Sequence, residues 1–93
     1  MDPTLDVARK AALKLFDDAV DIAFVESRPT GEQIFTGGRR NKAGKILVSL
    51  NPNGTKASVE WKSGDGRRNT EYRIFRVEGL PLTGDVPVAQ SVR

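Results

Sequence analysis

Basic side chains are the residues of this chain whose type and spacing point most directly to a chemistry. Ten Lys or Arg residues lie between positions 35 and 76, against three acids, so this segment carries a net charge of +7. The first 34 residues carry four bases and seven acids, and the last 17 carry one base and two acids. A basic segment between two acidic ones attracts polyanions, of which nucleic acid is the most abundant in a cell. The pattern therefore predicts a surface that binds phosphate groups.

Residue types that commonly perform catalysis or hold metals are missing. The chain has no His and no Cys, which removes the commonest general base, the commonest metal ligand and any disulfide. Asp17, Asp18 and Asp21 are close in sequence, but no further ligand accompanies them. A solvated helix face explains these three acids better than a metal site does. We therefore expect a protein that is not an enzyme and that uses no cofactor or metal.

Residues 3–27 predict one long amphipathic helix. Asp2 and Pro3 suit the N-cap and the first helical position, and Pro29 disfavours helical geometry at Arg28. The predicted helix would therefore begin near Pro3 and end before Arg28. Its apolar stripe recurs at spacings of three and four residues and consists of Leu5, Ala8, Ala12, Leu15, Ala19 and Ile22.

From Gly31 onward the pattern changes to strands and turns. The turn sequence Asn-Pro-Asn-Gly at positions 51–54 separates two of the candidate strands, since Pro fixes φ and Asn and Gly accept left-handed geometry. The predicted strands are Glu32–Thr36, Lys45–Leu50, Thr55–Ser63 and Thr70–Val77.

These elements predict an α+β fold in which one N-terminal amphipathic helix packs on a four-stranded, mostly antiparallel sheet. At 93 residues the chain has the length of a single domain. That domain would span residues 1–93, with the helix at 3–27, the sheet at 32–77 and a C-terminal extension at 78–93. That extension could hold a short fifth strand around residues 86–88 or form a loose tail.

Side-chain pairing predicts which residues share a face of the sheet. A loop with its tip at residues 65–68 would combine aromatic pairing with opposite-charge pairing. Trp61 and Tyr72 are then expected in the core, while Leu47 and Phe75 would be apolar exceptions on the charged face. The predicted opposing pairs are Trp61 with Tyr72, Lys62 with Glu71, Glu60 with Arg73, and Ile46 with Val59.

The meander also predicts that the basic loops converge. In an antiparallel meander the first and third hairpin loops lie at the same end of the sheet, so the loops at 37–44 and 64–69 should meet. Paired Arg side chains suit bidentate contacts with phosphate. The predicted nucleic-acid-binding residues are Arg39, Arg40, Lys42, Lys45, Lys62, Arg67, Arg68 and Arg73.

Three functions follow, in order of preference. The first is a small basic nucleic-acid-binding protein that contacts mainly phosphates, with DNA and RNA both open. The second is a phage or mobile-element protein whose basic rim docks on an acidic patch of a host protein and inhibits it. The third is a small histidine-free ribonuclease toxin.

One short resemblance relates to the third function. The run Tyr72–Val77, YRIFRV, resembles the basic core strand of RelE-type ribonuclease toxins over about six residues. Those toxins also have a strand before their helices, which is not predicted here. No catalytic residue is assigned from this resemblance.

The N-terminal residues contain no basic segment followed by an apolar run, which a secretory signal would need. The longest apolar stretches fall far short of the roughly 20 residues that span a membrane. A cysteine-free composition fits a reducing compartment. We therefore expect a cytoplasmic location without membrane insertion.

Overall fold

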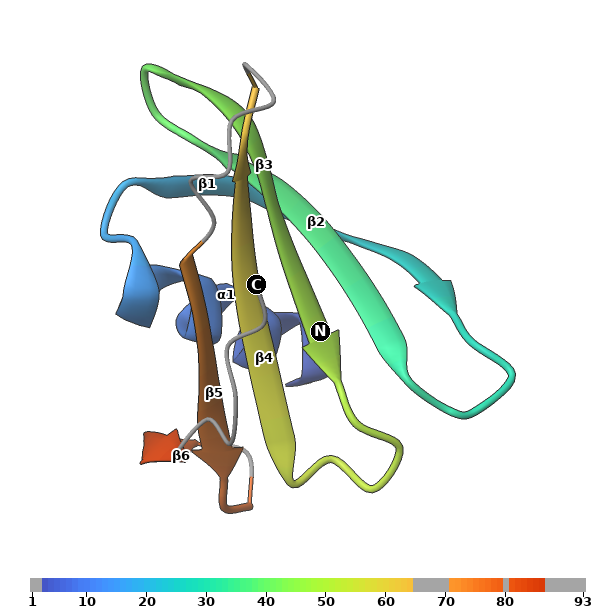
Figure 1. Ribbon diagram of the computed structural model, residues 1–93. Helices are drawn as coiled ribbons and strands as arrows, with labels where there is room; N and C mark the ends of the chain where they lie inside the picture. The colour runs from blue at the N-terminus through green and yellow to red at the C-terminus, as the bar shows by residue number, and fades with distance from the viewer. Residues whose placement is uncertain (1–2, 65–70, 80, 87–93) are drawn as a thin grey trace.

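One helix packs against one face of a six-stranded antiparallel sheet (Figure 1). The computed structural model describes residues 3–64, 71–79 and 81–86. Within these, helix α1 covers Pro3–Leu15, and the strands run in chain order with each antiparallel to the next. The predicted α+β architecture is confirmed, whereas the predicted number of four strands is wrong. The strands are β1 (Ala19–Ser27), β2 (Gln33–Arg39), β3 (Lys42–Leu50), β4 (Lys56–Ser63), β5 (Glu71–Val77) and β6 (Leu82–Val86).

The predicted helix over 3–27 is wrong in its second half. It begins at Pro3 as expected but ends at Leu15, and the chain re-forms as strand β1 from Ala19. Residues 20–25 are rich in β-branched and aromatic side chains, which pack better on a pleated surface than on a helix. The spacing of their apolar residues fits both the helical and the strand period, so periodicity alone could not distinguish a helix from a strand here. The proposed N-cap Asp2 lies outside the described residues.

The helix lies close to the sheet because its buried face is made of small side chains. Ala8, Ala11 and Ala12 are fully buried and Val7 nearly so, which lets the helix backbone approach the strands. The sheet face toward α1, here called the inner face, supplies most of the remaining core residues, including the largest ones. These are Phe35, Ile46, Val48, Leu50, Ala57, Val59, Trp61, Phe75 and Val77. The predicted burial of Trp61 is confirmed.

Strand β1 approaches β2 closely at one glycine. A Cβ at Gly37 would collide with the side chain of Ile22 and lie 2.9 Å from the carbonyl oxygen of Val20. Ile22 is itself buried in the core. Gly37 therefore makes room for β1 to bring Ile22 over the sheet.

The register between β4 and β5 differs by one residue from the prediction. Trp61 lies opposite Glu71, and Glu60 lies opposite Tyr72. A one-residue slip exchanges the two faces of a strand, so Phe75 is buried in the core and Tyr72 is exposed. Burying a large apolar side chain is worth about 1.5–3 kcal/mol, more than an exposed ion pair at about 0–1 kcal/mol. Burial of Phe75 therefore outweighs the charge pairs on which the prediction relied.

The register between β3 and β4 also differs, but by an even number of residues. Ile46 lies opposite Trp61, and Val48 lies opposite Val59. A two-residue shift leaves every side chain on its predicted face. The assignment of Lys45, Leu47 and Lys62 to the face away from α1 is therefore confirmed.

The C-terminal extension contributes a strand that the prediction placed too late. Strand β6 pairs with β5, with Ile74 opposite Val86 and Val77 opposite Leu82. It begins after a turn in which the Glu78 backbone N–H donates to the Pro81 carbonyl at 3.0 Å. Leu82 packs against the core. Positions 87–88 of the predicted short strand lie outside the described residues.

Candidate nucleic-acid interface

The hairpin that joins β2 to β3 carries the first group of predicted binding residues. Arg39 and Lys42 lie opposite each other across the turn, and Asn41 adopts the left-handed conformation, with φ at 61°. Asn tolerates this geometry better than most residues. The predicted eight-residue loop is therefore a tight two-residue turn formed by Arg40 and Asn41.

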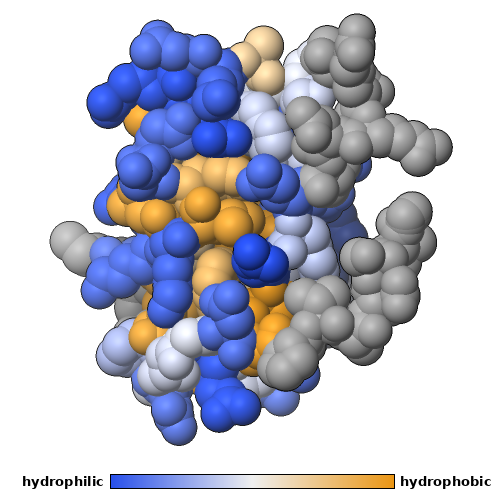
Figure 2. Space-filling view, turned by 60° about the vertical axis from the view of Figure 1, so that its left-hand side comes forward, coloured by the Kyte–Doolittle hydropathy of each residue, from blue (hydrophilic) through white to orange (hydrophobic). Residues whose placement is uncertain are grey.

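This turn is tied to two other parts of the chain. The Arg40 backbone N–H donates to the carbonyl of Asp18 at 2.9 Å, just before β1. The Gly64 N–H donates to the carbonyl of Ala43 at 2.8 Å, just after β4. The β2–β3 turn and the end of β4 therefore lie side by side at the upper end of the molecule in Figure 1. Hydrophilic side chains cover this end in Figure 2, above a band of apolar ones.

Arg39 is occupied by internal contacts rather than offered to solvent. Its Nε donates to Asp18 Oδ1 at 2.9 Å, and its side chain is only 17% exposed. The guanidinium lies 4.2 Å from the ring centroid of Phe16 and 5.1 Å from that of Trp61. Such cation–π contacts favour a planar, weakly hydrated guanidinium. Arg39 thus closes the upper edge of the core, and its predicted contact with phosphate stays a prediction.

The ion pair with Arg39 changes the acidity of Asp18. The hydrogen bond from the Arg39 side chain holds the pKa of Asp18 below its usual value. Partial burial acts in the opposite direction, and the positive charges of Arg39 and Lys42 add to the lowering. A neutral Asp18 would lose much of this interaction, so the closure of the core edge depends on an ionised carboxylate.

Four other predicted cations are exposed near this end. Lys45 and Lys62 are direct cross-strand partners on the face away from α1, and neither forms an ion pair with another described residue. They flank Leu47 along a hollow of about 460 Å³. We call the set Arg40, Lys42, Lys45 and Lys62 the basic end.

A second hollow lies beside Arg39 and has a mixed charge. Its volume is about 480 Å³, and its lining includes Lys42, Trp61 and Glu71. The carboxylate of Glu71 disfavours a phosphate there. The hollow between Lys45 and Lys62 is therefore the better candidate for phosphate.

Arg73, another predicted binding residue, does not join the basic end. Arg73 lies opposite Val59 on the side of β5 that faces α1, and its Nε lies 3.9 Å from an Asp85 carboxylate oxygen. The predicted pairing of Arg73 with Glu60 is thus wrong, and so is that of Lys62 with Glu71. Both corrections follow from the one-residue register difference. Arg67 and Arg68 lie outside the described residues.

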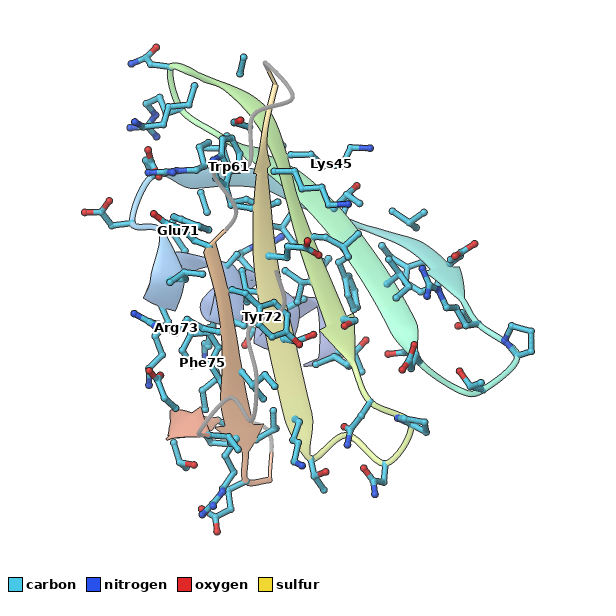
Figure 3. All side chains as sticks on the ribbon, viewed as in Figure 1. Lys45, Trp61, Glu71, Tyr72, Arg73 and Phe75 are labelled. Carbon is cyan, nitrogen blue, oxygen red and sulfur yellow. The ribbon has the colours of Figure 1, made fainter. Side chains whose placement is uncertain are left out.

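Tyr72 is the functional candidate that the predicted register concealed. Figure 3 shows it in front of the sheet, on the opposite side of β5 from Phe75. It is 40% exposed, and its direct partner on β4 is Glu60. The alternation of YRIF allows either face to be apolar, so only the competing burial of Phe75 could have indicated this orientation.

No helix among the described residues is long and apolar enough to cross a membrane. The described acids form no group of three that could hold a metal ion, which includes Asp17, Asp18 and Asp21. Comparisons with protein-family models, with curated proteins and with solved structures found no significant match.

Proposed function

We propose that this protein binds nucleic acid through the basic end, mainly by contacts with phosphates. The observation that carries the proposal is the Lys45–Lys62 pair, two exposed ammonium groups held directly opposite each other with no described counter-ion. Like charges opposite each other destabilise a sheet. A bound phosphate would relieve this repulsion.

The shape of the basic end supports the same function. Arg40 lies in the β2–β3 turn and Lys42 directly follows it, and the backbone of Gly44 and Gly64 lines the hollow next to Lys45 and Lys62. Glycine backbone allows close approach of a phosphate, since no side chain intervenes. The ligand would therefore be recognised by charge and backbone rather than by base sequence.

The test compares two double variants that remove the same amount of charge. Lys45→Ala/Lys62→Ala alters the basic end, and Arg9→Ala/Lys10→Ala removes two exposed cations from α1. Binding to a fluorescent oligonucleotide is measured by anisotropy at several salt concentrations. The first variant should bind at least about 10-fold more weakly, and the slope of log K against log salt should fall by roughly 1.4–1.8, since each phosphate contact contributes about 0.7–0.9.

The control variant should bind like the unaltered protein. Equal losses in both variants would show that only net charge matters. An unaltered protein that binds no oligonucleotide at low salt would remove the proposal altogether.

A further inference from the structure

The sheet face away from α1 carries more than the basic end. We call the outward residues of β3, β4 and β5 the outer face; they are Lys45, Leu47, Ser49, Lys56, Ser58, Glu60, Lys62, Tyr72, Ile74 and Arg76. Direct partners share a face, so the register arranges these side chains in rows across the strands. The two middle rows combine apolar and aromatic side chains with Glu60 and two serines, and cations occupy the rows at both ends.

The charges on the outer face are paired in an unusual way. Lys45 lies opposite Lys62 at one end, and Lys56 lies opposite Arg76 at the other. Glu60 is the one acid among the outward residues of these three strands. Two like-charge rows each cost stability in the free protein. Their repetition at both ends of one face suits an extended anion that runs along the strands.

Tyr72 lies between the two cation rows. It is two residues along the sheet from the Lys45–Lys62 row, which corresponds to about 7 Å, and four residues from the Lys56–Arg76 row, or about 13 Å. It is 40% exposed. A tyrosine ring in this position presents a flat apolar surface between two sites for phosphate.

The outer face is hollowed next to this ring. A cavity of about 150 Å³ is lined by Tyr72, Ile74, the serines Ser49 and Ser58, Asn51, Lys56 and the acid Glu32. The two serine hydroxyl groups lie 2.6 Å apart and hydrogen-bond to each other, and each retains capacity to accept a further bond. The hollow thus combines an apolar wall with polar groups, one cation and one carboxylate, a lining that suits an uncharged base better than a phosphate.

We infer that the outer face binds single-stranded nucleic acid, with a base stacked on Tyr72 and the backbone running between the two cation rows. The inference rests on the proposed function and specifies its ligand. A base within a duplex is covered on both faces by its neighbours, whereas an unpaired base can stack on an aromatic side chain. A charged groove with an aromatic platform is the arrangement that single-strand binding requires.

The carboxylate of Glu60 provides an independent test, because removing its charge should raise the affinity rather than lower it. Glu60 is the direct partner of Tyr72 and precedes Lys62 by two residues on the same face. Its negative charge repels phosphates that approach the neighbouring lysines. Glu60→Gln should therefore strengthen binding of a single strand by about two- to fivefold at low salt, the range expected for one exposed charge worth about 0.5–1 kcal/mol.

The decisive experiment separates the ring from the charges. Tyr72→Leu removes the aromatic face but stays apolar, and Tyr72→Phe keeps the ring. A short fluorescent oligothymidylate and a duplex of equal length are titrated with each protein, and circular dichroism confirms that each variant folds. Tyr72→Leu should weaken single-strand binding by about 10-fold, since one stacked base is worth roughly 1–3 kcal/mol, and should leave the salt slope unchanged. Tyr72→Phe should bind like the unaltered protein.

A spectroscopic measurement tests the same contact. Tyr72 is the single tyrosine of the chain, so its ring signals in the proton NMR spectrum need no further assignment. Stacking of a base should shift these signals upfield when the oligothymidylate is added. No shift at saturation would overturn the inference.

The outcomes for the inference and for the proposed function are distinct. Normal single-strand binding by Tyr72→Leu, together with weak binding by Lys45→Ala/Lys62→Ala, would overturn the stacking inference and leave phosphate binding intact. Equal affinity of the unaltered protein for duplex and single strand would likewise overturn the stacking inference and leave phosphate binding intact. Absence of binding by the unaltered protein would remove both.

Discussion

Arg39 is the residue at which charge and packing are most closely connected. Its position in a basic turn suggested a phosphate contact, yet the side chain bonds to Asp18 and covers the rings of Phe16 and Trp61. Cation–π contacts contribute on the order of 0.5–2 kcal/mol each, depending on solvent exposure. The sequence showed that Arg39 is charged but not where its side chain points. That depends on the pairing of β1 with β2, which brings Asp18, the residue before β1, next to Arg39.

The lowered pKa of Asp18 leads to a prediction about acid stability. A carboxylate whose pKa is lower in the folded than in the unfolded state stabilises the fold above its unfolded value of 3.8 and loses this contribution as the pH falls through the folded value. Asp18→Asn should therefore lower the melting temperature at neutral pH, and the difference from the unaltered protein should shrink below about pH 4.

The control for this prediction is Asp17→Asn. Asp17 is exposed and forms no ion pair with a described residue. Its variant should melt like the unaltered protein at neutral pH. A constant difference between Asp18→Asn and the unaltered protein from pH 7 to pH 2.5 would contradict the proposed role of the ion pair.

At the scale of elements, the sequence predicted those strands whose ends are marked by turn-forming residues. Strands β3 and β4 are separated by Asn-Pro-Asn-Gly, and the Asn51 side chain accepts hydrogen bonds from the backbone of Thr55 and Lys56. Strand β1 has no such signal before it, and its apolar residues extend the helical spacing of α1. The β4–β5 register depended on a choice between burying Phe75 and pairing surface charges, which required the core to be known.

Packing between β1 and β2 gives a prediction at this scale. Gly37→Ala should lower the free energy of unfolding by about 1–3 kcal/mol, because the new methyl group must displace Ile22 or the backbone of β1. Gly38→Ala is the matched control, since a Cβ there meets no atom within 4 Å. Urea denaturation followed by tryptophan fluorescence measures both. Equal stability of the two variants would show that β1 does not pack against Gly37 as described.

At the scale of the whole molecule, the charge distribution was the most useful signal in the sequence. The segment that carries +7 corresponds to β2–β5, while the first 34 positions, which include α1 and β1, carry seven acids against four bases. A meander brings alternate turns to one end, and the structure places Arg40, Lys42, Lys45 and Lys62 near the same end. Composition could not show that Arg39 and Arg73 face the helix side, because that depends on strand register.

The last prediction concerns chemistry on the bound nucleic acid. A general acid or base near neutral pH would need a strongly shifted Glu, Lys or Tyr in a chain without His. Glu60 and Tyr72 are neighbours on the outer face, but both are in contact with solvent rather than enclosed in the core. The purified protein should therefore bind labelled single-stranded RNA and DNA and leave them uncut, with or without magnesium.

Gel electrophoresis after prolonged incubation measures this directly. Glu60→Gln and Tyr72→Phe provide the matched controls, because each keeps the shape of its side chain and removes the group that could transfer a proton. Cleavage that co-elutes with the protein and disappears in either variant would show that the outer face is an active site. Cleavage that persists in both variants would contradict the prediction unless it separates from the protein on a further column, and it would show that neither Glu60 nor Tyr72 performs the reaction.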